Sequence, residues 1–434
     1  MGLSVNRIVK NALQNYAFGG YLEWLLSPIY ALRSYSLNRK LVGVIDVRSR
    51  QLHDLKDENF EISIDPKNVV ILCRGLFKMN PSGISNILWL IGNSLAQSGH
   101  KITFVYEGKD VSKCFKKVPN ITFQSRAFLL SFKKGSAPHF LQSWCNFVST
   151  LFDSRKEEVI CISTIAGFEG LQLPARVKQL VFLVTNYSLV EKSSGISSTE
   201  RVRVISRIER EFLQRENVTP IADSNSILKD LSLELDLPEI HLKSKVCPLF
   251  WTSYPQIEQK TNLVSFLGRI EKRKGASILI AAWRLIPPEK RMGWKLLIIG
   301  PAGDDTEALA MLNESDPTIS WLGQVSEEEK NSRLAGTRIF VQPSKFESFG
   351  LTTIEAMHHG CAIIAAESAV NSEVVGDGVF YSGDSPYLLA KQLSFMIENP
   401  KLISIAGANM LNRARSEFSP AAFINHFGPI LDAF

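Results

Sequence analysis

The sequence predicts an α/β protein with two doubly wound, Rossmann-like domains, because two separate stretches alternate short apolar strands with helices. The first stretch opens at residues 68–73 and the second at residues 263–269, with a plausible hinge at residues 251–260. A chain of 434 residues is long enough for two or more domains, and 45% hydrophobic residues is enough for two cores.

Four regions are expected along the chain. Residues 1–66 form an N-terminal extension, residues 67–255 a first Rossmann-like domain, and residues 256–401 a second one. Residues 402–434, which include Phe418-Ser419-Pro420, are expected to cross back onto the first domain.

The first domain begins with a strand, a loop, a helix and another strand, which is how a doubly wound sheet opens. Its first strand is Asn68–Cys73, and a helix is entered near Gly83. Gly99-His100 then leads into a strand at residues 101–106. Further strands are expected at residues 159–163 and 179–185.

The second domain begins with a strand that ends in a cation, Arg269, followed by a basic turn and a helix from Ala276. Residues 337–344 are predicted to form a buried strand, which Pro343 ends because proline cannot donate to a strand ladder. The helix at residues 354–359 is closed by Gly360.

The composition fits an enzyme of a reducing compartment. Six cysteines are scattered without a Cys-x-x-Cys pair, which argues against a zinc ribbon or a disulfide framework. No run of apolar residues predicts a transmembrane helix, and the first residues lack a signal-peptide pattern. A net charge of +6 suggests an anionic partner, and nucleic acid is the least favoured one because no nucleic-acid-binding motif is present.

The N-terminal extension leaves two interpretations open. Its aromatic residues between Leu13 and Leu41, with basic residues around them, are typical of a helix lying on anionic lipid. The alternative is a helix packed on the catalytic domain, since Pro28 and Gly19-Gly20 interrupt any long amphipathic face.

The most informative window is residues 347–355, because it carries two carboxylates around a helix start. Glu347 lies in the loop that leaves a strand, and Glu355 lies one turn into the following helix. Between them, Phe349-Gly350-Leu351 offers backbone N–H groups at a helix N-terminus, which favours phosphate. Glu355 is placed to accept hydrogen bonds from ribose hydroxyls. Groups suited to a sugar, a diphosphate and a ribose within one loop and helix indicate that the ligand is a nucleotide-sugar.

A second group of residues supports this interpretation. Arg269 and Lys274 bring two positive charges to one loop at a strand terminus, which suits a diphosphate leaving group. Lys272 and Arg273, between them, are interpreted as parts of a solvated basic turn.

Four motifs in order resemble the donor domain of a family-4 retaining glycosyltransferase, over about residues 262–380. They are Gly268-Arg269-x₄-Lys274-Gly275, Ile298-Ile299-Gly300-Pro301-Ala302-Gly303, Trp321-Leu322-Gly323-Gln324-Val325-Ser326, and Phe346-Glu347-Ser348-Phe349-Gly350-Leu351-Thr352-Thr353-Ile354-Glu355-Ala356-Met357. The resemblance implies a GT-B fold, with an acceptor domain and a donor domain facing each other across the active site. It also marks residues 221–226 as a strand before the linker and residues 246–250 as a closing strand.

The resemblance further implies the roles of individual residues. Arg269, Lys274 and Glu347 would be catalytic. Donor-binding residues would be Gly83, Gly268, Arg269, Lys274, Gly323, Gln324, Val325, Glu347, Phe349, Gly350, Leu351, Thr352 and Glu355. No cofactor is expected, because the nucleoside-diphosphate-sugar is a co-substrate. The acceptor would be a glycan or a lipid-linked saccharide, and the enzyme would work in the cytoplasm or at the inner face of a membrane.

The sequence also departs from the family pattern. Ser82 replaces one of two adjacent glycines in the first loop, and no histidine follows the strands that end near Thr164 and Thr185. Asn186 is therefore the candidate for a sugar contact from the first domain. No Asp-x-Asp pair occurs, so no metal is expected. A non-catalytic partner subunit and a nucleotide-sugar epimerase of the same architecture remain alternatives.

Overall fold

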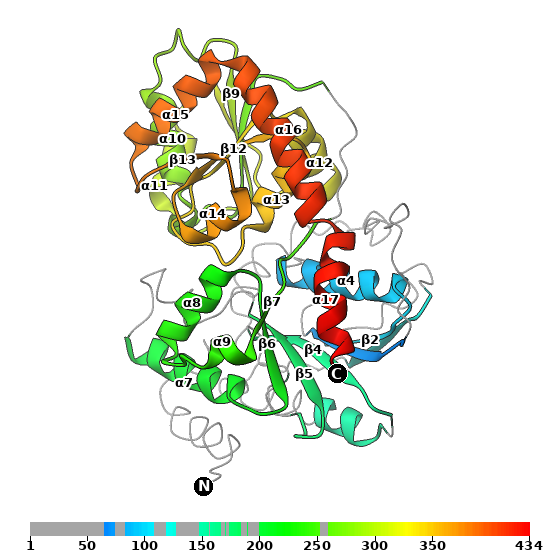
Figure 1. Ribbon diagram of the computed structural model, residues 1–434. Coiled ribbons are helices and arrows are strands. Elements are labelled where there is room, and N and C mark those ends of the chain that lie inside the picture. The colour runs from blue at the N-terminus through cyan, green and yellow to red at the C-terminus, as the bar shows by residue number, and fades with distance from the viewer. Residues whose placement is uncertain are drawn as a thin grey trace.

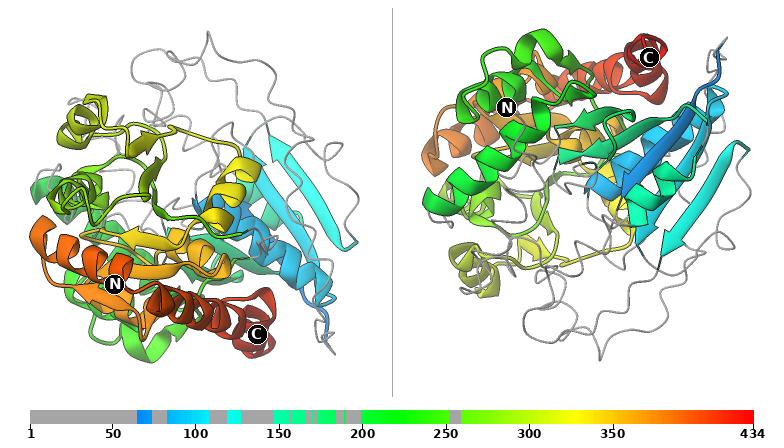
Figure 2. Two further views of the ribbon diagram at one scale, coloured as in Figure 1. Left: turned by 90° about the horizontal axis from the view of Figure 1, so that it is seen from above. Right: turned by 90° about the horizontal axis from the view of Figure 1, so that it is seen from below.

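The protein contains two parallel β-sheets, each flanked by helices, and the two units lie one above the other (Figure 1). Because they are stacked in this way, they overlap when the molecule is viewed from above or below (Figure 2). The computed structural model describes residues 65–73, 83–107, 119–126, 147–155, 157–165, 170, 173–183, 189, 199–251 and 259–434.

The first unit holds a seven-stranded sheet with the order β3-β2-β1-β4-β5-β6-β7. The strands are β1 (Asn68–Cys73), β2 (Lys101–Glu107), β3 (Ile121–Arg126), β4 (Ile160–Thr164), β5 (Lys178–Phe182), β6 (Val218–Ala222) and β7 (Lys245–Val246). Its helices include α4 (Gly83–Gln97), α7 (Thr199–Leu213), α8 (Asn225–Glu234) and α9 (Ile240–Lys243). All five residues of β4 are buried, as expected for a parallel strand covered on both faces.

The closing strand of this sheet is shorter than the sequence predicts. Residues 246–250 were expected to form it, but β7 contains only Lys245–Val246. The N–H of Cys247 still donates to Ala222 O at 2.8 Å. Pro248 follows and has no N–H, so the ladder cannot continue.

The second unit holds a six-stranded sheet with the order β10-β9-β8-β11-β12-β13. The strands are β8 (Leu263–Leu267), β9 (Lys295–Ile299), β10 (Ile319–Trp321), β11 (Ile339–Gln342), β12 (Ala362–Ala366) and β13 (Val379–Tyr381). The helices are the short 3₁₀ turn η4 (Lys272–Lys274), α10 (Ala276–Leu285), α11 (Thr306–Asn313), α12 (Glu327–Gly336), α13 (Leu351–His358), α14 (Ala369–Val375), α15 (Pro386–Glu398) and α16 (Pro400–Glu417).

The strand order of the second sheet fixes where a ligand can bind. The chain runs outward from β8 to β10, then returns to the other side of β8 and continues through β11 to β13. The order therefore reverses between β8 and β11, and in open α/β sheets ligands occupy the crevice outside the carboxyl ends of the strands at this point. The loops that follow β8 and β11 carry Lys274 and Glu347.

The chain returns to the first unit after α16. The helix α17 (Pro420–Asp432) packs against α4, on the other side of the junction from α16 (Figure 1). Its Phe423 and Phe427 stack on each other at 5.1 Å and also contact Phe250 and Phe182 of the first unit. The chain leaves the first unit at Trp251 and returns to it at Phe418. These two residues are in contact, since Trp251 N donates to Phe418 O at 3.1 Å.

No helix in the described part of the chain is long and apolar enough to cross a membrane. Residues 1–64, which contain the aromatic extension, lie outside the described residues.

Candidate active site

The loops after β8 and β11 are in direct contact, and Gly275 makes this possible. Gly275 adopts a left-handed conformation, with φ of 72°, at the start of α10. A Cβ atom at this position would lie 2.3 Å from Pro343 O, so any other residue would push the two loops apart.

Arg273 connects the same two loops, which corrects its interpretation as part of a solvated turn. Its carbonyl accepts from Lys345 N at 2.9 Å, and its Nη1 donates to Phe346 O at 3.0 Å. Its side chain is only 19% exposed, whereas the neighbouring Lys272 is exposed as predicted. Arg273 is thus the residue that holds the loop before Glu347 in place, and its position between two other basic residues concealed this.

Lys274 and Glu347, two predicted catalytic residues, form a buried ion pair. Nζ of Lys274 lies 2.5 Å from Oε1 of Glu347, and the side chains are 17% and 7% exposed. Gln342, the last residue of β11, donates to the same oxygen at 2.9 Å. Gln342 was not among the residues predicted from the sequence.

The charge state of Glu347 follows from these contacts. Burial alone would raise the pKa of Glu347, but the positive charges of Lys274 and Arg273 lower it below its usual value. Glu347 is therefore ionised at neutral pH and can only accept hydrogen bonds. It cannot act as a general acid, but it is suited to hold hydroxyl groups.

Arg269, the third predicted catalytic residue, is more open to solvent. It follows Gly268 after β8, its Nε lies 3.4 Å from Oε1 of Glu271, and its side chain is 44% exposed. A guanidinium that is accessible and only loosely paired remains free to rotate toward an anionic ligand.

The N-terminus of α13 lies in the same region. Gly350 is the N-cap residue, with φ of 90°, and among the described residues no side chain caps the first N–H groups of Leu351 and Thr352. Phe349 is buried and meets Phe418 in a T-shaped contact at 5.8 Å. The start of this helix is therefore anchored by the residue at which the chain crosses back to the first unit.

Glu355, the predicted ribose ligand, has a lysine partner that the sequence-based reasoning missed. Oε2 of Glu355 lies 2.5 Å from Nζ of Lys330, and both side chains are less than 10% exposed. Lys330 also pairs with Glu327 at 2.6 Å, and its ammonium lies 4.9 Å from the centre of the Trp251 ring. In the sequence, three glutamates before Lys330 are typical of an exposed helical ion pair, and no local pattern indicates burial.

The predicted base-binding segment lies beside the carboxyl end of β9. The carbonyl of Gly323 accepts from Gly300 N at 2.8 Å. Gln324 is exposed and Val325 is half-buried. This segment is therefore part of the same edge of the sheet as Gly268.

Two predicted residues belong to the first unit. Gly83 is the first residue of α4. Asn186 lies outside the described residues, as does the loop with Ser82 that precedes α4.

The two units also touch through a carboxylate that the sequence did not reveal. Glu373 of α14 accepts hydrogen bonds from Asn225 N at 2.9 Å, from Ser226 N at 2.7 Å and from Ser226 Oγ, all at the N-terminus of α8. Asp223, just before α8, is fully buried, and among the described residues no side chain donates to its carboxylate, which meets only the backbone amides of Asp223 and Ser224. Burial raises the pKa of Asp223 well above its usual value.

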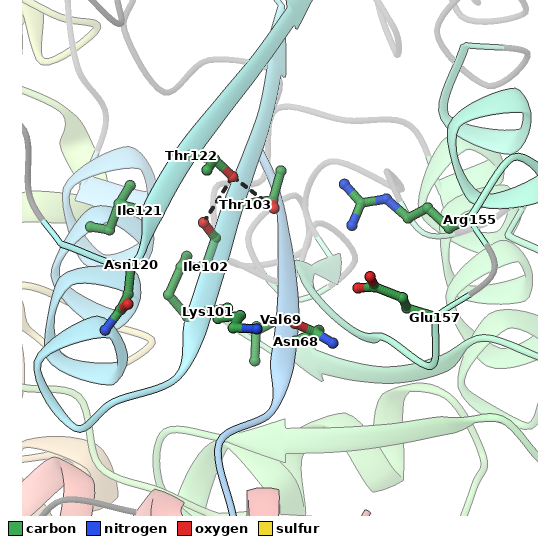
Figure 3. Close-up of a pocket in the computed structure, with 10 residues that line it drawn as sticks. All are labelled: Asn68, Val69, Lys101, Ile102, Thr103, Asn120, Ile121, Thr122, Arg155 and Glu157. Atoms are coloured by element: carbon green, nitrogen blue, oxygen red, sulfur yellow. Dashed lines mark hydrogen bonds between the residues drawn. The ribbon is translucent and has the colours of Figure 1, made fainter.

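A hollow of about 340 Å³ lies elsewhere on the first unit. Lys101, Asn120 and Asn68 line it at the amino ends of β1, β2 and β3, with Arg155 and Glu157 opposite (Figure 3). Ligands of open parallel sheets bind at the carboxyl ends of the strands, so we do not assign this hollow to the donor. Among the described residues, no group of three or more His, Cys, Asp and Glu side chains is placed to hold a metal ion.

Comparison with protein families gives a match in the second unit. Residues 252–414 match the model of the family described as glycosyl transferases group 1. All four motifs singled out in the sequence fall within this range.

Two curated relatives match about a quarter of this chain each. The O-antigen chain mannosyltransferase B of Escherichia coli is 36% identical over 115 residues, which are 26% of this chain and 30% of the relative. The phosphatidyl-myo-inositol mannosyltransferase of Mycolicibacterium smegmatis is 33% identical over 118 residues, with the same shares. The chain thus spans under a third of the length of these two relatives.

Solved structures resemble the whole two-unit arrangement. Sucrose-phosphate synthase from Thermosynechococcus elongatus has a TM-score of 0.70 at 17% identity and covers 85% of this chain and 98% of its own. Anabaena HepE, solved with UDP and glucose, has a TM-score of 0.64 at 14% identity and covers 85% of this chain and 100% of its own. These similarities, with the two parallel sheets, confirm the predicted GT-B fold.

Proposed function

We propose that this chain, whose residues 252–414 match the model of the glycosyl transferases group 1 family, moves a hexose from a nucleoside diphosphate to an acceptor hydroxyl. The observation that carries the proposal is the buried ion pair of Lys274 and Glu347 at the point where the strand order reverses. The pair places a cation that can bind phosphate beside an ionised carboxylate that can accept hydrogen bonds from hydroxyls. A nucleotide-sugar carries both phosphate and sugar hydroxyls, so it matches this pair.

Each part of the donor would meet a matching group. Lys274 and Arg269 would neutralise the negative charge that develops on the leaving diphosphate. The N–H groups at the start of α13 would add to this through the helix dipole. Glu347 would accept hydrogen bonds from the sugar, Glu355 from the ribose, and residues 323–325 would lie near the base.

We further propose that the reaction retains the anomeric configuration and does not need a divalent metal. The cations of Lys274 and Arg269 would provide the stabilisation that a metal supplies in other sugar transferases. Turnover should then survive excess EDTA, whereas full loss with rescue by Mn²⁺ or Mg²⁺ would contradict the metal-free part of the proposal.

The acceptor is proposed to be a glycan or a lipid-linked saccharide. The names of the two mannosyltransferase relatives support this class, since one concerns O-antigen chains and the other a phosphatidyl-inositol. The aromatic and basic residues between Leu13 and Leu41 would bring the enzyme to an anionic membrane surface. Flotation with anionic vesicles at low salt, with and without residues 1–45, tests this part separately.

The central experiment screens nucleoside-diphosphate hexoses, with mannose donors among them, for thermal stabilisation and then for transfer. A ligand at 100 times its dissociation constant adds about 2.7 kcal/mol to the free energy of unfolding. The wild type should be stabilised by one donor, and Glu347→Gln should lose transfer while still binding the free nucleoside diphosphate. If a donor is converted to another sugar nucleotide without an acceptor, the protein is an epimerase. If no donor binds, the chain is a non-catalytic subunit.

A further inference from the structure

Lys330 is buried, which is rare for a lysine without a dedicated role. The residue is 7% exposed, and its ammonium contacts Glu355, Glu327 and the face of Trp251. Of the two carboxylates, Glu327 is 58% exposed, whereas Glu355 is as buried as the lysine itself. Glu355 is thus the partner whose charge depends on Lys330.

This contact leaves Glu355 with one oxygen for a ligand. Oε2 is shielded from solvent and faces Nζ of Lys330 at 2.5 Å. Among the described residues, nothing donates a hydrogen bond to Oε1. A hydroxyl that reaches Glu355 would therefore bond to Oε1 while Lys330 holds the other oxygen.

We propose that Lys330 is a positioning residue that keeps Glu355 ionised and directs its Oε1 at the ribose of a nucleoside diphosphate. This inference rests on the proposed function. Lys330 does not touch the ligand; it acts through Glu355, and it makes the enzyme select ribose over 2′-deoxyribose.

The electrostatics of the pair supports this role. Burial, the largest effect, raises the pKa of Glu355 above its usual value; Lys330 opposes this rise, and Glu327 adds to it. Lys330 itself stays charged, because Glu355 and Glu327 outweigh the effect of burial on its pKa. Lys330 and Glu327, both on α12, are the charged groups that act on Glu355; Trp251 is uncharged, and His359 faces Asn331 instead.

Removing the lysine charge should therefore turn Glu355 from an acceptor into a neutral acid. In Lys330→Met, burial would act on Glu355 without a counter-charge, and the carboxyl would hold its proton at neutral pH. A neutral carboxyl binds ribose more weakly, and raising the pH should restore the ionised form.

The experiment measures dissociation constants of the full chain for GDP and UDP and for dGDP and dUDP, from mildly acidic to mildly alkaline pH. The wild type should bind the ribose nucleotide with a dissociation constant about tenfold or more lower than that of its 2′-deoxy form, as expected for a hydrogen bond to a charged acceptor. This ratio should depend little on pH. Lys330→Met should lose this preference at neutral pH and regain it as the pH rises. Lys330→Arg should keep it.

Controls separate this role from a structural one. Lys290→Met breaks an exposed lysine–glutamate pair far from the site and should change nothing. Glu355→Gln should also lose the ribose preference, and adding Lys330→Met to it should cause no further loss. If Lys330→Met does not fold, Lys330→Gln carries the same pH test.

Two results would contradict the role of Lys330 without contradicting the proposed function. One is a folded Lys330 variant without charge that still favours ribose at neutral pH. The other is a further loss of nucleotide binding when the Lys330 change is added to Glu355→Gln. If neither GDP nor UDP binds the wild type, the proposed function fails as well.

Discussion

Each of the two glutamates of the site has its own lysine. Lys274 pairs with Glu347 and Lys330 pairs with Glu355, both at 2.5 Å and both shielded from solvent. Breaking a buried pair by removing one partner is costly, because the other charge is left without compensation. The lysines of this site therefore affect stability as well as ligand binding.

Lys274→Ala and Arg269→Ala should each lower turnover by on the order of 10²-fold, by analogy with the loss of one preorganised donor. They should differ in stability. Lys274→Ala leaves Glu347 buried and unpaired and should cost roughly 3 kcal/mol in denaturant unfolding. Arg269→Ala removes an exposed side chain and should cost little. Near-normal turnover in both variants would remove these residues from the phosphate site.

Asp223→Asn should stabilise the protein at neutral pH. The pKa of Asp223 is raised by burial in the folded state, so its contribution to stability is complete at low pH and is lost as the pH rises toward the folded pKa. The asparagine of the variant does not ionise, so the variant's free energy of unfolding does not fall in this way as the pH rises. The gain in free energy of unfolding should be clear at pH 7 and shrink toward about pH 4, where the unfolded aspartic acid gains its proton.

The control for this comparison is Asp377→Asn, at an exposed position, which should show no such trend. A gain that is equal at both pH values, or a loss of stability at neutral pH, would show that Asp223 is not held in its neutral form.

Single residues of the site were predictable where a motif marks them. Lys274 and Glu347 stand in motifs with fixed spacing, and the structure brings them together. Lys330 and Glu373 stand in no such motif, and their partners Glu355 and Asn225 are distant in sequence. Their roles depend on how α12 meets α13 and how the two units meet, which local patterns do not encode.

At the level of elements, the loops after β8 and β11 act as one piece. Gly275 allows their close approach, and Arg273 of the first loop is hydrogen-bonded to Lys345 and Phe346 of the second. Because the motif residues Arg269 and Lys274 lie in one loop and Glu347 in the other, the geometry of the site depends on this contact.

Gly275→Ala should therefore impair both stability and turnover. The added methyl meets Pro343 O at 2.3 Å in addition to adopting a left-handed backbone. Gly383→Ala is the matched control: its φ is 70°, but nothing lies within 4 Å of the added atom. It should cost only about 1–2 kcal/mol for the backbone and leave turnover intact. Equal behaviour of the two variants would mean that the loop contact is not important.

The strands that open each unit and carry its motifs were predicted from their apolar residues. β1, β8 and β11 are mostly apolar runs bounded by polar or turn residues, so they stand out. β3 was not anticipated, because only Ile121 and Phe123 of Ile121–Arg126 are apolar, which is too short an alternation to mark a strand. It is an edge strand and forms because β2 offers it a partner.

At the scale of the whole molecule, two contacts between the units stand out among the described residues. One is the crossing, where Phe418 joins Trp251 and Phe349. The other is the bond between Glu373 and the N-terminus of α8, where a carboxylate meets the positive end of a helix dipole. The second contact lies away from the crossing chain and can open without breaking it.

Glu373→Ala should consequently favour a more open arrangement. The variant loses three hydrogen bonds between the units while each unit keeps its own core. Small-angle scattering of the nucleotide-free protein should give a larger radius of gyration than for the wild type. Glu398→Ala, which removes an exposed carboxylate on α15, is the control. Identical scattering of all three proteins would show that this bond does not hold the units together.

The position of α17 has a consequence for how the protein is made. A ribosome delivers the first unit first, and domains generally fold in that order. Here, however, Phe423 and Phe427 of α17 complete the core around Phe182 and Phe250, and they are translated only after the whole second unit. The second unit, continuous from β8 to α16, can reach its native state before the first has all its core residues. The part of the protein that is synthesised first is therefore the part that finishes folding last.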